Sequence, residues 1–141
     1  MNLLWIYDRH MQLRCVLENV ATVSYDLKNN DLSVASFQLP VEDPKGEMIH
    51  AHDFVRIQDC GKEIGLFRVI TWEGSVIPNA SAFTTYQCEH VIATLLDSVM
   101  DGDHVIGSGD MTTADVIRYI LSFQTTRLWE LDKCDFDDAF E

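Results

Sequence analysis

Residues 83–100 read FTTYQCEHVIATLLDSVM, and the hydrophobic period of this stretch changes partway along it. The first half alternates as a β-strand does, with Tyr86 and Cys88 on one side. The second half has apolar residues at helical spacing, which predicts an amphipathic helix over 89–99. The apolar stripe of that helix consists of Val91, Ile92, Leu95, Leu96 and Val99. Such a stripe needs a sheet to cover it, and we expect its two leucines to be buried.

The sequence before residue 83 predicts that sheet. Alternating or fully apolar runs, each bounded by turn residues, predict strands over 3–7, 12–17, 20–27, 32–39, 53–58 and 63–72. Asn29-Asn30-Asp31 and Asp59-Cys60-Gly61-Lys62 supply residues that favour hairpin turns. A slip in the apolar parity of 32–39 predicts a bulge near Ala35-Ser36.

The composition changes after Met100. Stretches rich in glycine and aspartate predict a linker over 101–111. Thr112 begins a predicted helix, with Asp115 at capping-box spacing, and a further strand is predicted over 128–136. We therefore predict an α+β fold. Residues 1–100 form a small antiparallel β-barrel or split sandwich with one packed helix, and residues 112–141 form the truncated start of a second α/β domain.

The charge of the chain limits its partners. The 141 residues carry a formal net charge of -13, and 47% of them are hydrophobic. Acidic proteins repel phosphates, so we expect no binding to nucleic acid or to an anionic membrane. The N-terminal apolar run is too short for a signal peptide or a membrane span, so synthesis in the cytoplasm is expected. The four cysteines are scattered without a CxxC pair, which favours free buried thiols.

Several residues of metal-binding type occur, but in unsuitable patterns. His50 and His52 could place two imidazoles on one side of a loop, and Cys88 and His90 are the other close nitrogen and sulfur pair. A site would need further converging ligands. The acidic run near the end lacks the DxDxDG pattern of a calcium loop; its residues are Asp132, Asp135, Asp137, Asp138 and Glu141. We predict neither a metal nor a cofactor.

No catalytic set is evident either. Asp53, Asp59 and Glu63 flank a predicted hairpin, where exposed charges commonly protect sheet edges. Cys88 alternates with Tyr86 toward the apolar layer, so a core thiol is favoured over a nucleophile partnered by His90. Motifs such as the P-loop, GxGxxG, GxSxG and HExxH are absent from the sequence. We predict that the chain is not an enzyme.

The predicted strand 63–72 is apolar on both faces. Leu66, Ile70 and Trp72 cannot share a face with Phe67 and Val69 unless a bulge intervenes. Such a strand lies either between two layers or against another chain. The strand 3–7 repeats this pattern, so the candidate subunit interface consists of Trp5, Phe67, Val69 and Trp72.

Four sequence phrases carry a resemblance to a known family. They are LLWIYD (3–8), SFQLP (36–40), DFVRIQDCGKEIGLFRVI (53–70) and TYQCEHVIATLLD (85–97). Together they resemble the N-terminal region of the phage minor structural proteins. That family includes the tail-associated lysins, or prophage tail endopeptidases, of phages that infect Gram-positive bacteria.

The resemblance implies a baseplate-hub fold, in which a β-barrel domain and an inserted α/β domain precede a second barrel in a trimer at the distal end of the tail tube. It implies contacts with the distal tail protein, the tail tube and the tape measure. The protein would lie in the virion tail tip and, during assembly, in the host cytoplasm. Any peptidoglycan-cleaving activity would belong to a C-terminal region. Alternatives are a free-standing β-rich binding module, a hydrolase accessory domain, or an adaptor for a host receptor or glycan.

Overall fold

A computed structural model describes residues 2–75, 82–105, 111–124 and 129–132. The chain divides into two compact units, Met1–Ile92 and Ala93–Glu141. The division between the units lies after residue 92. The sequence pattern had placed the end of the first domain at residue 100. Every described strand belongs to the first unit, so the first unit is the sheet domain.

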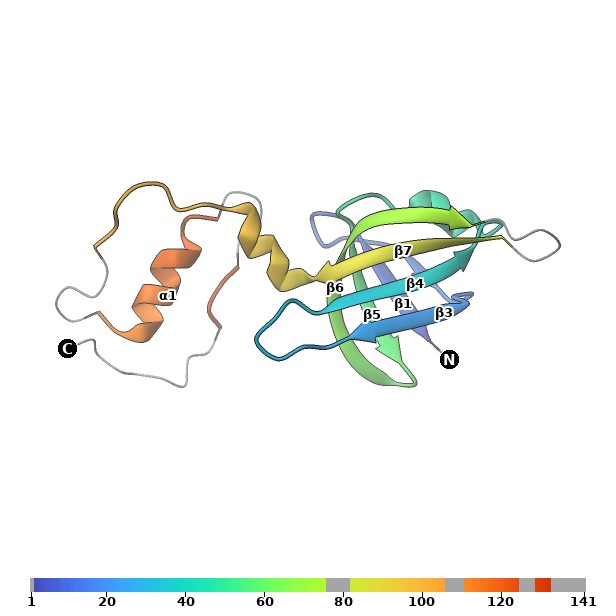
Figure 1. The fold of residues 1–141 in the computed structure, drawn as a ribbon, viewed down its shortest axis with the longest axis horizontal. Helices are drawn as coiled ribbons and strands as arrows, with labels where there is room; N and C mark the ends of the chain where they lie inside the picture. The colour runs from blue at the N-terminus through green and yellow to red at the C-terminus, as the bar shows by residue number, and fades with distance from the viewer. Residues whose placement is uncertain (1, 76–81, 106–110, 125–128, 133–141) are drawn as a thin grey trace. The chain divides into compact units, whose positions relative to one another are not determined.

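The first unit is built on a seven-stranded antiparallel sheet, which confirms the predicted α+β fold class. Its strand order is β2-β1-β5-β6-β7-β4-β3, and Figure 1 shows the sheet curled, with β1 behind β3 and β4. The strands are β1 Leu3–Tyr7, β2 Leu13–Leu17, β3 Thr22–Asp26, β4 Val34–Pro40, β5 Phe54–Asp59, β6 Lys62–Ser75 and β7 Phe83–His90.

The sheet does not close into the predicted barrel. Its edge strands β2 and β3 follow each other in sequence, but they do not pair among the described strands. Residues 18–21 join them, so the facing ends can lie at most about 18 Å apart. The Val16 carbonyl on edge strand β2 accepts a hydrogen bond from Lys45 Nζ at 2.7 Å. The amide of Ala21 donates to the carbonyl of Gln38, so the chain is already hydrogen-bonded to β4 just before β3 begins.

The concave face of the sheet encloses the hydrophobic core. The strands that form it contribute alternate residues, as the period of two requires. The buried cluster consists of Leu4, Ile6, Leu17, Ala35, Phe37, Leu39, Ile49, Val55, Ile57, Phe67, Val69, Tyr86 and Cys88. Ile49 comes from the segment that follows the short 3-10 helix η1, Pro44–Met48. The core therefore draws on every strand except β3, whose Val23 is only partly buried.

Strand β6 is bent by two bulges. After the predicted turn, in which Cys60 and Gly61 have φ of 49° and 81°, Ile64 is the extra residue opposite β5. Ile70 is the extra residue opposite β7, since Val69 pairs with Cys88 while the next pair begins at Thr71. A bulged strand bends and twists more strongly than a regular one. The bulge at Ile70 therefore reverses the alternation and turns Trp72 to the face of Val69.

The bulge predicted near Ala35-Ser36 is wrong. Strand β4 pairs with both β3 and β7 from Val34 to Gln38 without a register shift. The parity slip in the sequence arises because Leu32 lies in the loop before the strand and Val34 is an exposed apolar residue on the other face. The predicted turn at residues 29–31 is confirmed, and Asn30 adopts a φ of 60°.

The predicted amphipathic α-helix over 89–99 is also wrong. Strand β7 continues to His90, and a 3-10 helix, η2, spans Val91–Asp97. A 3-10 helix has three residues per turn, so positions four apart do not share a face. Ala93 and Thr94 are buried, whereas Leu96, one of the two leucines expected in the core, is 72% exposed. Leu95 is only partly buried.

The second unit contains the helix α1, Thr113–Leu121. The predicted capping box is confirmed, because Thr112 Oγ1 accepts from the Asp115 amide and Asp115 Oδ2 accepts from the Thr112 amide. His104 Nδ1 lies 2.9 Å from the Tyr119 hydroxyl, and its ring meets Phe123 edge-on. The strand predicted over 128–136 is not formed in its described part, 129–132. The remaining residues of that strand lie outside the described ranges.

The core position of Phe67 generates the first prediction. Phe67 has no exposed surface, and truncating a buried phenylalanine leaves a cavity that costs about 3–5 kcal/mol. Phe67→Ala should lower the free energy of unfolding by that amount in chemical denaturation. Val34→Thr, at a 45% exposed position of β4, is the control and should change it by less than about 0.5 kcal/mol. Equal stability of the two variants would contradict this core.

Candidate functional site

The four residues of the predicted interface do not share one surface. Phe67 and Val69 are fully buried inside the first unit. They offer no surface to a neighbouring subunit, so this part of the prediction is wrong: Phe67 pairs with Val55 and Val69 with Cys88, which puts both on the core face. Trp5 lies between the core residues Leu4 and Ile6 on β1 and therefore points to the opposite, convex face. Trp72 lies on the core side of β6.

Trp5 already has a cation from its own chain. The Arg56 guanidinium lies 5.3 Å from the centre of the Trp5 ring, as in a cation–π contact. Arg56 also forms a bidentate pair with Glu63, with the closest nitrogen and oxygen 2.7 Å apart. Glu63 raises the pKa of Arg56 above its ordinary value, because its carboxylate stabilises the charged form. The convex face at Trp5 is therefore a charge-paired surface.

Trp72 ends a row of aromatic rings that crosses three strands. Phe37, Tyr86 and Trp72 occupy opposed positions on β4, β7 and β6. The Phe37 and Tyr86 rings stack with centres 4.8 Å apart, and the Trp72 ring lies 6.1 Å from that of Tyr86. Phe37 and Tyr86 are buried, while Trp72 is 47% exposed. The row therefore runs from the core to the surface.

An open cleft of about 420 Å³ lies where this row reaches the surface. We call it the Trp72 cleft, and its lining residues are Leu39, Pro40, Val41, Glu42, Asp43, Pro44, Gly46, Glu47, Trp72, Thr84 and Tyr86. The Tyr86 hydroxyl points toward η1, 3.5 Å from the Gly46 carbonyl. Burial raises the pKa of Tyr86, and the Asp43 carboxylate raises it further. Tyr86 is therefore a neutral, fixed part of the cleft floor.

The rim of the Trp72 cleft is acidic. Glu42, Asp43 and Glu47 line it, and no Lys or Arg does so among the described residues. Asp43 caps η1 by accepting from the Lys45 amide. Lys45, the basic residue of η1, points instead to β2, where its Nζ binds the Val16 carbonyl and lies 3.8 Å from Glu18. The cleft thus combines an exposed indole with carboxylates.

A second cleft, of about 290 Å³, surrounds the loop histidine His50. Asp53, expected as an exposed hairpin charge, is buried there. Its Oδ2 accepts from the His50 amide at 2.9 Å and lies 3.4 Å from His50 Nδ1 and 3.5 Å from Arg14 Nε. These contacts hold the turn before β5 in place. Asp59 and Glu63 have other partners, since Tyr25 donates to Asp59 and Arg56 pairs with Glu63.

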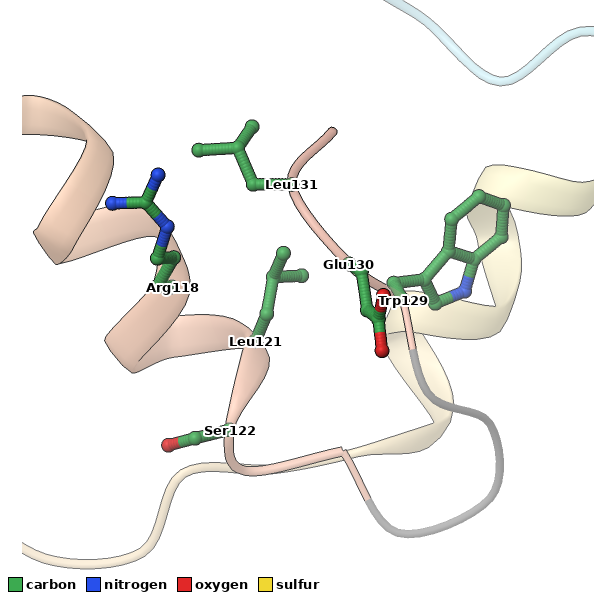
Figure 2. Close-up of a pocket in the computed structure, with 6 residues that line it drawn as sticks. All are labelled: Arg118, Leu121, Ser122, Trp129, Glu130 and Leu131. Atoms are coloured by element: carbon green, nitrogen blue, oxygen red, sulfur yellow. The ribbon is translucent and has the colours of Figure 1, made fainter. Parts of the chain in front are cut away.

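The second unit has a pocket of about 350 Å³ between α1 and the segment 129–131. Figure 2 shows Arg118, Leu121 and Ser122 on the helix side and Trp129, Glu130 and Leu131 across from them. Gln124 fastens this segment, because its Oε1 accepts from the Trp129 amide. The Trp129 indole donates to Thr94 Oγ1 at 2.9 Å. Ser122 Oγ donates to the Tyr119 carbonyl, so it is held as a helix-end hydroxyl.

The cysteines and histidines that the structure describes do not converge on a common site. Cys15, Cys60 and Cys88 are free thiols, and Cys134 lies outside the described residues. Cys88 is buried in the core, where desolvation raises its pKa to about 12. Within the described ranges, no group of three or more His, Cys, Asp or Glu side chains could hold a metal ion. Of the acidic run near the end, only Asp132 is described, and it is exposed.

Comparison with known proteins yields a match in fold. No family model matches the sequence, and no curated protein matches it. Among solved structures, the chain is similar to a tail protein from Neisseria meningitidis MC58, with a TM-score of 0.51 and 10% sequence identity. The match covers 86% of this chain and 33% of that chain, so this chain spans about a third of the tail protein's length. At this identity the two proteins are shown to share a fold.

No helix in the described part of the chain is long and apolar enough to cross a bilayer. The sequence identified Trp72 as an interface candidate but not the cleft beside it, because the acidic rim lies between the predicted strands 32–39 and 53–58, where no structure was predicted. Pro40 and Pro44 lie at the start of this segment, and they were the sequence signal for a turn there. Only the fold brings η1 next to β6 and β7.

The burial of Cys88 generates the second prediction. The thiolate is the reactive form of cysteine, and the raised pKa of Cys88 keeps this side chain a thiol at neutral pH. In a Cys134→Ser background, iodoacetamide should label exposed Cys60 readily and Cys88 only after denaturant is added. Peptide mass mapping would locate the label. Labelling of native Cys88 as fast as that of Cys60 would restore the nucleophile reading.

Proposed function

We propose that the chain is a structural part of a phage or prophage tail. The observation that carries this proposal is the fold shared with a tail protein over most of the chain. It agrees in kind with the family resemblance of the sequence phrases. The described residues support a scaffold, since their buried ionisable groups, such as Asp53, serve local structure.

The finer proposal is an N-terminal domain of the tail tip or baseplate hub. In that role it would join the tail tube to distal tail parts and contact the distal tail protein, the tube and the tape measure. The full-length protein would be a homotrimer. A head-to-tail trimer uses two different patches on each subunit. Trp5 on the convex face stays a candidate for one of them, while Phe67 and Val69 do not.

We further propose that these 141 residues perform no catalysis. A peptidoglycan-cleaving activity, if the natural protein has one, would belong to sequence beyond this chain. The second candidate function is a free-standing β-rich binding module or a hydrolase accessory domain. The Trp72 cleft favours binding over catalysis, because it holds an aromatic ring and carboxylates without a nucleophile–base pair among its lining residues.

The third prediction tests incorporation into tails. Particles purified from cells that express the gene at its natural locus should contain the protein, as measured by mass spectrometry. Gold-labelled antibody should mark the distal tail end in electron micrographs. Deletion of the gene should leave tails absent or incomplete, and the wild-type gene supplied in trans is the control. Normal, infective particles that lack the protein would contradict the proposal.

The fourth prediction separates scaffold from hydrolase. The purified 141-residue chain should give no clearing band in a peptidoglycan zymogram. A known lysozyme on the same gel is the positive control. A band that persists through repurification, and disappears when a single residue is replaced, would overturn the non-enzyme proposal.

A further inference from the structure

The two tryptophans of the sheet domain, partly buried Trp5 and exposed Trp72, differ in the partners of their rings. Trp5 carries the guanidinium of Arg56 on its ring, and that guanidinium is paired with Glu63. Trp72 has carboxylates around it but no cation from a described residue. The described part of the sheet domain thus contains one Trp–Arg–Glu arrangement, at Trp5, and one tryptophan, Trp72, that has carboxylates but no cation beside it.

The carboxylates of the Trp72 cleft are available for a partner. Glu42 and Glu47 form no ion pair with any Lys or Arg that the structure describes. Lys45, between them in sequence, is held at β2 through the Val16 carbonyl. A cation that entered the cleft would therefore meet two carboxylates and an aromatic face at once. Cation–π contact and charge pairing then act on the same group.

The shape of the cleft favours a peptide segment. Its apolar lining, which includes Leu39, Val41 and Pro44, offers contact for aliphatic side chains next to the cation. Tryptophan and tyrosine in partly desolvated pockets are the residues that most often dominate protein–protein binding. The Tyr86 ring, itself stacked on Phe37, lies beside the Trp72 ring, and this contact restricts the indole before a partner binds.

We propose that the Trp72 cleft binds an arginine-bearing, aliphatic segment of another protein. The guanidinium of this segment lies on the Trp72 ring between Glu42 and Glu47. Arginine fits better than lysine, because its planar group stacks on an indole and forms bidentate pairs with carboxylates. A different protein fits better than a second copy of this chain, because copies that each carry a net charge of -13 repel one another. The inference rests on the proposed function only in taking that protein to be a tail component.

The experiment uses nitrogen-15 NMR on the 141-residue chain. The indole signal of Trp72 is assigned by its loss in Trp72→Phe, since the chain has three tryptophans. The probe is acetyl-Leu-Arg-Leu-amide, and the matched control is acetyl-Leu-citrulline-Leu-amide, which has the same shape without the charge. We expect a saturable shift of the Trp72 signal and an affinity at least about fivefold higher for the arginine probe.

Charge-neutral variants test the role of the rim. Glu42→Gln with Glu47→Gln should lower the affinity of the arginine probe about threefold, toward that of the citrulline probe, and leave the citrulline affinity unchanged. The arginine preference that remains comes from the cation–π contact with Trp72. Glu63→Gln, which removes the carboxylate beside Trp5, is the matched control and should change neither affinity. Retained signal dispersion in each spectrum establishes that the variants are folded.

Three outcomes would overturn the inference. The first is no saturable shift at probe concentrations up to about 10 mM, above the millimolar Kd expected for so small a ligand. The second is equal affinity for both probes, which would make the cleft a purely apolar groove. The third is a shift of the Trp72 signal with protein concentration alone, abolished by the double glutamine variant, which would identify a second copy as the occupant.

The two proposals can fail separately. Probe binding by a protein absent from tail particles leaves the cleft chemistry intact and removes the tail assignment. A protein found in tails without probe binding keeps the tail assignment and removes the cleft chemistry.

Discussion

The fold of the sheet domain depends on the bulge at Ile70 in β6. This strand is the longest in the sheet and must supply core residues along a curved path. Without an extra residue, strict alternation would send Trp72 to the face opposite Val69. The bulge opposite β7 keeps Val69 and Trp72 on one face, where they oppose Cys88 and Tyr86. The same face of β6 therefore carries buried core residues before the bulge and the exposed Trp72 ring after it.

The same bulge explains why an apolar strand does not require a second protein layer. Phe67 and Val69 fill the core, and Leu66 and Ile70 on the other face are only partly buried. The convex face is not a bare apolar surface, because Arg68 on β6 pairs with Glu89 directly across on β7. Trp5 nearby is covered by Arg56. Cross-strand charge pairs of this kind stabilise a sheet modestly and keep its outer face polar.

The acidic residues of the sheet domain differ in whether they have a cationic partner. On the convex face, Glu63 and Glu89 are matched by arginines. At η1, Asp43 serves as a helix cap, while Glu42 and Glu47 face the Trp72 cleft. Such uneven matching gives a surface specificity for one kind of partner, because complementary charge directs binding more than it strengthens it.

The sequence by itself determined the strands, the hairpin turns and the capping box of α1, because these follow from local alternation and from residues such as Asn30, Gly61 and Thr112 that favour specific backbone geometry. It also identified Trp72 as a candidate for contact with another protein. It did not determine which face of β6 is the core face, because one extra residue in a strand changes the parity and depends on pairing with β7. Nor could it distinguish η2 from an α-helix, since period three and period 3.6 differ little over seven residues. Only the tertiary structure decided the Trp72 cleft, because its floor comes from β6 and β7 and its acidic rim from the loop and helix after β4. These segments become neighbours when β7 pairs with both β6 and β4.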